Sequence, residues 1–213
     1  MTENNETKGA AAFIALLEAP VEDGEGFIAQ WSKHMAVLRR APGFRDARLH
    51  QALSPQARFP MIAVVRWDDL AASERANADP EIRATVPNAS EHAKVRRAAY
   101  ELFDAIGPDW SGADGGGVTM INAFDLPADR VGEFLEVWTP RARWISGTRG
   151  FLGYRMLRAV GTAQVPLVNL VHYSDEDAWK ALQANPDFQA RRAADPPYVT
   201  ANPTLVEVVA EFS

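Results

Sequence analysis

The sequence predicts an α+β fold made of two tandem βαββαβ units, and three observations lead to this prediction. The chain matches itself, since "GFRDARLHQAL" begins at Gly43 and "GFLGYRMLRAV" begins at Gly150. The same order of strand-like and helix-like segments occurs in both halves. The length of 213 residues is enough for two domains of about 100 residues each.

The self-match extends through most of the chain. In the first part of each half, matching residues lie 107 positions apart, as in Phe27/Phe134, Trp31/Trp138 and Phe44/Phe151. After one loop the spacing falls to 106, as in Pro60/Pro166, Trp67/Tyr173 and Glu101/Glu207. A constant register with one single-residue deletion indicates an internal duplication. We expect a first unit over 11–106, a Gly-rich linker over 107–116 and a second unit over 117–213.

Each half begins with a strand and an amphipathic helix. The first strands are "AAFIALL" and "VTMINAF". The helices that follow have apolar residues at spacings of i, i+1, i+4, i+8 and i+11, which is one helical face. These residues are Phe27, Ile28, Trp31, Met35 and Leu38, and then Phe134, Leu135, Trp138, Ala142 and Ile145. Glycine in "APGF" and "TRGF" ends each helix. Pro140 should kink or split the helix of the second half.

Two more strands, a second helix and a last strand complete each half. The second strands are "RDARLHQAL" and "LGYRMLRAV", and the third strands are "MIAVVRW" and "LVNLVHY". A helix then begins near Asp69 and near Asp175, where Ser174 and Asp177 form a capping-box pattern. The last strands are "YELFDAI" and "VEVVAEF". This order is that of a ferredoxin-like unit.

A ferredoxin-like unit has helices on one face of its sheet only, so its other apolar face needs a cover. Two units in one chain can cover each other. We therefore expect them to pack sheet to sheet as an intramolecular pseudo-dimer. The alternative is two independent domains joined by a linker.

Composition narrows the classes of function. The net charge is −6 and no run of Lys and Arg is longer than a pair, so no nucleic-acid partner is expected. No apolar run reaches the roughly 18 residues of a membrane span, so no membrane partner is expected either. The polar N-terminus is not typical of a signal peptide. With no cysteine in the chain, a cytoplasmic location is the default expectation.

The sequence predicts neither a metal site nor a bound cofactor. No two of its histidines have the spacing of metal ligands on a helix; they are His34, His50, His92 and His172. The Gly-rich "GADGGG" precedes a strand rather than a helix, so it does not fit a phosphate-binding loop.

Several motifs occur in both halves. The first half has Trp31 ahead of "PGF", then "ARLHQAL", "VVRWDD" and "ADPEIR". The second half has "RGF", "VHYSDEDAW" and "NPDFQARR". With these motifs each half resembles an antibiotic biosynthesis monooxygenase domain, within the dimeric α/β-barrel group. The resemblance implies that the two units form such a barrel within one chain, and it leaves a further homo-oligomer open.

The resemblance also implies a set of site residues. Relatives that oxidise polyketide anthrones without a cofactor line their pocket with an Asn and a Trp on the third strand. An aromatic residue and an Arg on the second helix and a His on the second strand complete it. The second half carries four of these positions, at Asn169, Tyr173, Trp179 and Arg192, with Leu157 at the His. The first half matches at His50 and Trp67, and carries Ala63, Ser73 and Val86 at the others.

From these matches, the expected catalytic residues are Asn169, Arg192 and Tyr173. The expected substrate-binding residues are Trp179, Asn122, Trp67 and His50. Asn169 and Tyr173 are four apart on a strand and so share one face. Asn169 would bind a phenolic or enone group, and Arg192 would stabilise an anion. The alternative is that Asn169 bonds a neighbouring backbone group, Trp179 belongs to the core and Arg192 is solvated.

The first functional hypothesis is a cofactor-independent monooxygenase that oxidises a small aromatic or polyketide-like substrate with O2. The second is a non-catalytic ligand-binding or stress-response module. A haem-degrading relative is less consistent with the sequence, because Arg192 and Val86 stand where an axial His is needed. We expect one principal site, in the second unit, and a first unit that is mainly scaffolding. In the first unit, the position equivalent to Asn122 would be that of Leu16 or its neighbour.

Overall fold

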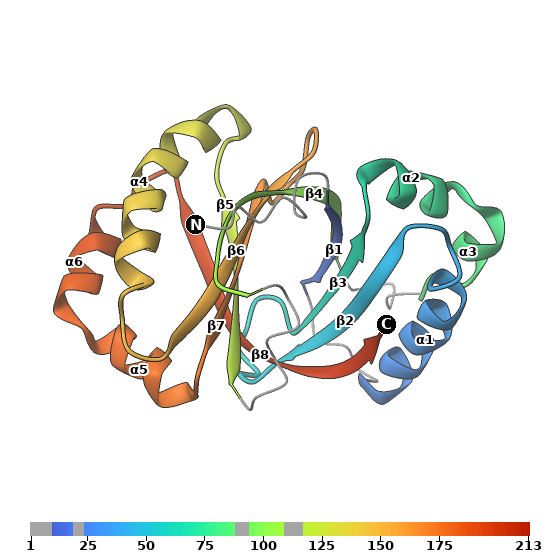
Figure 1. Ribbon diagram of the computed structural model, residues 1–213, viewed down its shortest axis with the longest axis horizontal. Helices are drawn as coiled ribbons and strands as arrows, with labels where there is room; N and C mark the ends of the chain where they lie inside the picture. Colours follow the sequence, from blue (N-terminus) through green and yellow to red (C-terminus); the bar gives the residue numbers. More distant parts are fainter. Residues whose placement is uncertain (1–9, 19–23, 88–93, 109–116) are drawn as a thin grey trace. The chain divides into compact units, whose positions relative to one another are not determined.

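The computed structural model describes residues 10–18, 24–87, 94–108 and 117–213 (Figure 1). Most of the predicted linker, over 109–116, and His92 lie outside these residues. The chain forms two compact units. The first contains residues up to 102 together with 159–161 and 207–213, and the second contains 103–158 and 162–206.

The first unit is a four-stranded antiparallel sheet covered by three helices on one face (Figure 1). The strand order is β4-β1-β3-β2, and the strands are β1 (Ala11–Leu17), β2 (Phe44–Ala52), β3 (Met61–Trp67) and β4 (Val95–Ile106). The helices are α1 (Gly24–Leu38), α2 (Leu70–Ala78) and α3 (Pro80–Ala84). The apolar stripe of α1 packs on alternate residues of the strands, as its sequence predicts.

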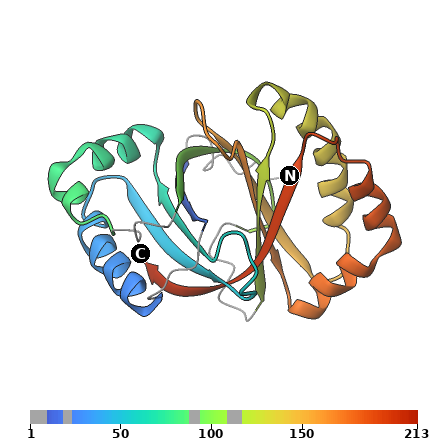
Figure 2. The same ribbon diagram turned by 180° about the vertical axis from the view of Figure 1, so that it is seen from behind.

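The second unit repeats this arrangement, with helices again on one face of the sheet (Figure 2). The strand order is β8-β5-β7-β6, and the strands are β5 (Val118–Asp125), β6 (Phe151–Ala159), β7 (Leu167–Tyr173) and β8 (Thr200–Phe212). A short 3-10 turn, η2 (Ala128–Arg130), precedes the helices α4 (Val131–Ile145), α5 (Glu176–Ala184) and α6 (Pro186–Ala193).

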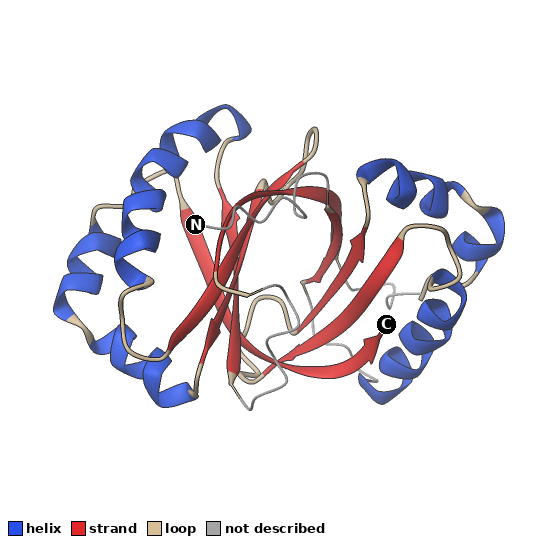
Figure 3. Ribbon diagram, in the orientation of Figure 1, coloured by secondary structure: helices blue, strands red, loops and turns tan. Residues whose placement is uncertain are grey.

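Two long strands, drawn in red with the other strands in Figure 3, have residues in both compact units. The last residues of β8 belong to the first unit, where Glu211 pairs with Arg48 of β2. The last residues of β4 belong to the second unit, where the Asp104 carboxylate accepts a hydrogen bond from Tyr154 of β6. The strand order β1-β3-β2-β8-β5-β7-β6-β4 therefore closes into a barrel-like sheet to which both halves contribute.

The predicted fold class, two tandem ferredoxin-like units forming a dimeric α/β barrel in one chain, is confirmed by this strand order. The alternative of two independent domains is wrong, because each unit contains residues of the other repeat. None of the described helices is long and apolar enough to cross a membrane.

Aspartate and asparagine side chains start the helices that follow the third strand of each unit. Asp69 and Asp175 accept hydrogen bonds from the backbone N–H three residues on. The predicted capping box is therefore one residue out of place, since Asp175 is the N-cap and the Ser174 hydroxyl donates to its carboxylate. Asp79 and Asn185 cap the next short helices, each followed by a proline at the first helical position.

Helix α4 is continuous through Pro140. Of the two predicted effects of this proline, a kink or a split of the helix, the split is therefore wrong. The helix runs unbroken from Val131 to Ile145. Proline removes one backbone donor from the helix interior. The acceptor that loses its donor is the Glu136 carbonyl, four residues before the proline. Next to it, the Thr139 hydroxyl donates to the Leu135 carbonyl at 2.7 Å.

Glycine is required at the turn that ends the first helix of each unit. Gly43 and Gly150 have φ angles of +88° and +79°, in the left-handed region that other residues seldom adopt. Each also lies against the helix after the third strand. A Cβ atom on Gly150 would come within 2.4 Å of the Ala178 Cβ.

We expect Gly150→Ala to lower the free energy of unfolding by more than about 2 kcal/mol, because the backbone strain and the clash with Ala178 add together. Gly161→Ala is the matched control. Gly161 has φ +72° but no heavy atom within 4 Å of an added Cβ, so only strain of about 1 kcal/mol applies. Urea unfolding followed by circular dichroism measures both variants, and equal losses would contradict the steric part of the argument.

Candidate functional site

The second unit has a cavity of about 70 Å³ between its sheet and its helices. Four of the residues predicted from the sequence line it together: Asn122, Asn169, Tyr173 and Arg192. They come from β5, β7 and α6. The rest of the wall is mainly apolar and aromatic, with Phe124, Trp138 and Phe151 among its members. The structure thus gathers residues that are up to 70 positions apart in the sequence into one cavity.

Two asparagines face each other across neighbouring strands in this cavity. Asn122 of β5 and Asn169 of β7 are direct partners in the antiparallel register. The Oδ1 atom of each is buried and has no hydrogen-bond partner among the described residues. An unpaired buried amide group costs about 1–3 kcal/mol, so a ligand that satisfies it binds with that advantage. The alternative in which Asn169 bonds a backbone group is not found in the described part of the chain.

An arginine that the sequence analysis did not single out also lines the cavity. Arg141 is buried on α4, with 7% of its surface exposed, and its Nη1 atom donates to the Asp195 carboxylate at 2.5 Å. Asp195 lies just beyond α6 and lines the cavity as well. The pair puts a guanidinium, neutralised by a carboxylate, in the wall of the same cavity as the two asparagines. The signal for it in the sequence is a charged residue between the apolar Trp138 and Ala142 of one helical stripe.

Two tyrosines of the cavity have raised pKa values. Burial raises the pKa of the Tyr173 hydroxyl above its usual range. Burial, with the hydrogen bond that the Tyr154 hydroxyl donates to Asp104 at 2.6 Å, raises the pKa of Tyr154 in the same direction. Both hydroxyls are therefore neutral at physiological pH and are not phenolate bases. The one hydrogen of the Tyr154 hydroxyl is already donated to Asp104, so Tyr173 is the one of these two tyrosines that can donate to a ligand.

Trp179 and Arg192 have peripheral positions. Trp179 of α5 packs against the core cluster of the unit and does not line the cavity. Its indole Nε1 atom is nevertheless buried and has no partner within the described part of the chain. Arg192 lines the cavity but is largely exposed, so it lies at the opening.

The structure does not bring His50 and Trp67 together. Trp67 of β3 lines a cavity in the first unit. His50 of β2 belongs to the opposite face of that sheet, where it is buried and its Nδ1 atom bonds the Ile62 carbonyl at 3.1 Å. His172 likewise lies on the far side of β7 from Asn169, and its Nδ1 atom bonds the Thr119 hydroxyl.

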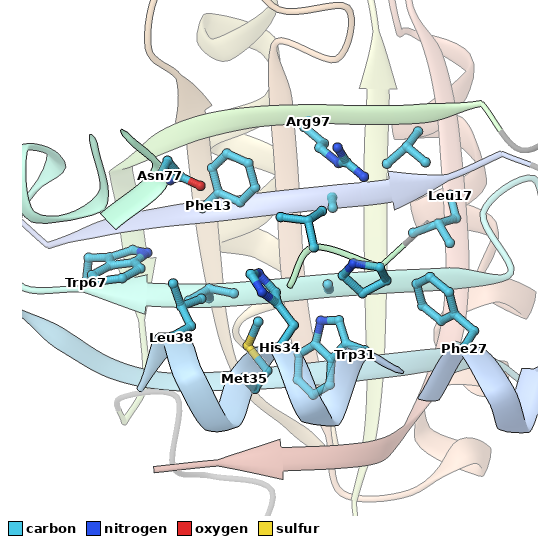
Figure 4. Close-up of a pocket in the computed structure, with 16 residues that line it drawn as sticks. Phe13, Leu17, Phe27, Trp31, His34, Met35, Leu38, Trp67, Asn77 and Arg97 are labelled. Carbon is cyan, nitrogen blue, oxygen red and sulfur yellow. The ribbon is translucent and has the colours of Figure 1, made fainter. Parts of the chain in front are cut away.

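The first unit has its own cavity, of about 110 Å³, between the sheet and α1 (Figure 4). Its wall is apolar except at His34, Asn77 and Arg97, and it includes Trp31, Met35 and Trp67. The residue matching Asn122 is Ala15, the neighbour of Leu16, and it pairs with Ala63 in the same register as the two asparagines. The expectation that the first unit is mainly scaffolding does not account for this larger cavity.

The described residues contain no group of three or more His, Cys, Asp or Glu side chains that could hold a metal ion. No histidine occurs among the described residues that line the cavity of the second unit.

Both cavities lie in copies of one known domain. The family model for antibiotic biosynthesis monooxygenase matches residues 11–88 and again residues 117–194. The chain therefore belongs to the antibiotic biosynthesis monooxygenase family and carries two of its domains in tandem. The resemblance noted in the sequence is confirmed.

Solved structures with the same fold include proteins named as oxidase-like or as a monooxygenase, and a protein named as a regulator. An anthrone oxidase-like protein has a TM-score of 0.73 at 16% identity, covering 98% of this chain and 94% of its own. FN1347, a proposed monooxygenase from Fusobacterium nucleatum, has a TM-score of 0.68 at 10% identity, covering 95% and 94%. A major regulator of staphylococcal pathogenesis has a TM-score of 0.55 at 11% identity, covering 93% and 99%. No curated protein matches the sequence.

We expect Asp195→Ala to lower the free energy of unfolding by about 2–3 kcal/mol, because it leaves the buried Arg141 charge without its partner. Glu133→Ala is the matched control, since it breaks the exposed pair between Glu133 of α4 and Arg130 just before that helix, and it should cost clearly less than Asp195→Ala. Urea unfolding measures both values. If Asp195→Ala lowers the free energy of unfolding no more than Glu133→Ala does, the buried pair does not stabilise the fold as argued.

Proposed function

We propose that the second unit holds the active site of a cofactor-independent monooxygenase. Its substrate is a small aromatic or polyketide-like molecule with a phenol or ketone group, and O2 is the oxidant. The observation that supports this most strongly is the pair of unpartnered asparagines in a cavity with aromatic walls. Membership of the antibiotic biosynthesis monooxygenase family and the fold shared with an anthrone oxidase-like protein are consistent with it.

The asparagines are suited to hold the oxygen atoms of such a substrate. A side-chain amide can donate through Nδ2 and accept through Oδ1, so the pair can bind a ketone oxygen and a neighbouring phenol together. One ring of the substrate would pack against Trp138 and Phe151, which line the same cavity. The other rings would extend through the opening, because a cavity of about 70 Å³ is too small for a whole anthrone. Because most of the wall is apolar or aromatic, these hydrogen bonds meet less competition from water than they would at the surface.

The reaction converts an anthrone CH2 group and O2 into a ketone and water. Loss of one C–H proton to water gives an enolate, which Asn169 and Asn122 stabilise through hydrogen bonds to its oxygen. The enolate passes one electron to O2, and the resulting radical and superoxide combine to form a C–O bond. The peroxide anion takes up the proton released in the first step and becomes a hydroperoxide. Loss of its outer oxygen as hydroxide and of the second C–H proton then yields the ketone and one water molecule.

Charged groups at the site favour the anionic intermediates. Arg141 is held by Asp195 inside the cavity, and Arg192 lies at its opening. A positive group near the enolate and the peroxide stabilises the charge that develops in both steps. Tyr173 remains protonated because burial raises its pKa, so it can donate a hydrogen bond to the same anions.

We expect Asn169→Ala to lower the rate of anthrone oxidation about 10–100-fold, because a buried donor to the enolate oxygen is lost. Arg192→Ala should have a smaller effect of about threefold to tenfold, because the guanidinium is largely exposed. The measurement is O2 uptake with dihydroxyanthrone, corrected for its uncatalysed oxidation at the same pH.

Gln51→Ala is the control, because it removes an exposed amide from the first unit and should leave the rate unchanged. If O2 uptake is unaffected by Asn169→Ala, the oxidation does not take place in the cavity of the second unit. Saturable anthrone binding with no O2 uptake above the uncatalysed rate would favour the non-catalytic binding module.

A further inference from the structure

The two cavities occupy equivalent places in the duplicated units but differ in chemistry. Trp31 and Trp138 are equivalent lining residues on α1 and α4, and Val65 and Val171 are equivalent on the third strands. The main difference lies at the centre of the sheet. Ala15 and Ala63 face each other there in the first unit, where the second has its two asparagines.

This exchange leaves the first cavity larger and more apolar at its centre. Its volume is about 110 Å³, against about 70 Å³ in the second unit. Its lining residues include no carboxylate and only one permanent positive charge, Arg97, which is largely exposed. An apolar molecule can therefore enter without removing a buried amide or carboxylate from a partner.

One buried hydrogen-bond donor faces this cavity without a partner. Trp67 is 1% exposed and lines the cavity, and its indole Nε1 atom has no acceptor among the described residues. Figure 4 shows Trp67 at one end of the row of lining side chains, with its ring nitrogen on the side of the other lining residues. Because indole can only donate, this end of the cavity is suited to a ligand that carries an acceptor.

The polar side chain that α1 contributes to this cavity, His34, already has a partner within the first unit. The His34 Nδ1 atom lies 2.8 Å from the Thr85 hydroxyl beyond α3. Burial, with a smaller effect of the Arg97 charge, lowers the pKa of His34, so the ring is neutral at physiological pH. His34 stands where the second unit has Arg141. The first cavity therefore lacks the buried cation of the second.

We propose that the first unit binds a second, separate ligand: a neutral, ring-containing apolar molecule with a single hydrogen-bond acceptor that bonds Trp67 Nε1. This site does not take part in the oxidation proposed for the second unit. The first cavity, at about 110 Å³, is smaller than an apolar cavity of about 150 Å³ that accommodates benzene in another protein. It is therefore suited to no more than one ring, with the rest of the ligand extending through its opening.

Acetophenone and ethylbenzene test this proposal, since each has one ring and only acetophenone has an acceptor. Titrations of the full-length protein are followed by ¹H–¹⁵N NMR of the tryptophan indoles, with the Trp67 signal assigned by its absence in Trp67→Phe. We expect acetophenone to shift the Trp67 signal saturably at one site. Trp67→Phe should weaken acetophenone about fivefold, measured by ligand-observed NMR, and ethylbenzene less than twofold.

The double variant Ala15→Asn with Ala63→Asn tests the site without removing a large core residue. Giving the first cavity the asparagines of the second should weaken ethylbenzene binding at least about tenfold, because the amides would lose hydrogen bonds to water. The matched double variant Asn122→Ala with Asn169→Ala should leave the Trp67 titration unchanged. The proposal is overturned if acetophenone leaves the Trp67 signal unmoved, or if only the second-unit variant alters the titration. Neither result depends on whether the second unit oxidises an anthrone.

Discussion

The alternation of side chains along β3 and β7 is the constraint on which both cavities depend. Successive residues of a strand point to opposite faces, so only every second position can reach the helices. Residues 61, 63, 65 and 67 do so in the first unit, and residues 167, 169, 171 and 173 do so in the second. A one-residue change in register would remove Asn169 and Tyr173 from their cavity and bring His172 into it. The aromatic and amide chemistry of the site therefore depends on the backbone pairing of the central strands.

Much of the fold could be predicted because the duplication doubles the information in the sequence. A weak strand pattern such as "VTMINAF" gains support when it aligns with "AAFIALL" at a fixed spacing. The last strands were predicted too short, since β4 begins at Val95 and β8 at Thr200. Their first residues, "VRRAA" and "TANPT", carry little apolar alternation, because these strand ends are only partly buried.

The candidate site was predicted only in part, and the missing residues share a physical reason. Asn122 and Asn169 stand out because amides are rare within apolar strands. Arg141 belongs to a helix and Asp195 to the chain after another helix, and each alone is an ordinary surface residue type. Only folding brings them within 2.5 Å. The cavity of the first unit could not be foreseen either, because small residues such as Ala15 and Ala63 give no signal in a sequence when their role is to leave space.

The sharing of β8 has a consequence for how the protein is made. The first unit includes residues 207–213, among them Glu211, which pairs with Arg48, and Phe212, whose ring packs against Trp31 with centroids 5.7 Å apart. On the ribosome, domains usually fold in order from the N-terminus. Here the first half cannot complete its own core until residues 207–213 have been synthesised. A nascent chain must therefore hold an unfinished sheet edge through the translation of more than a hundred further residues, and β8 completes the half that was synthesised earlier.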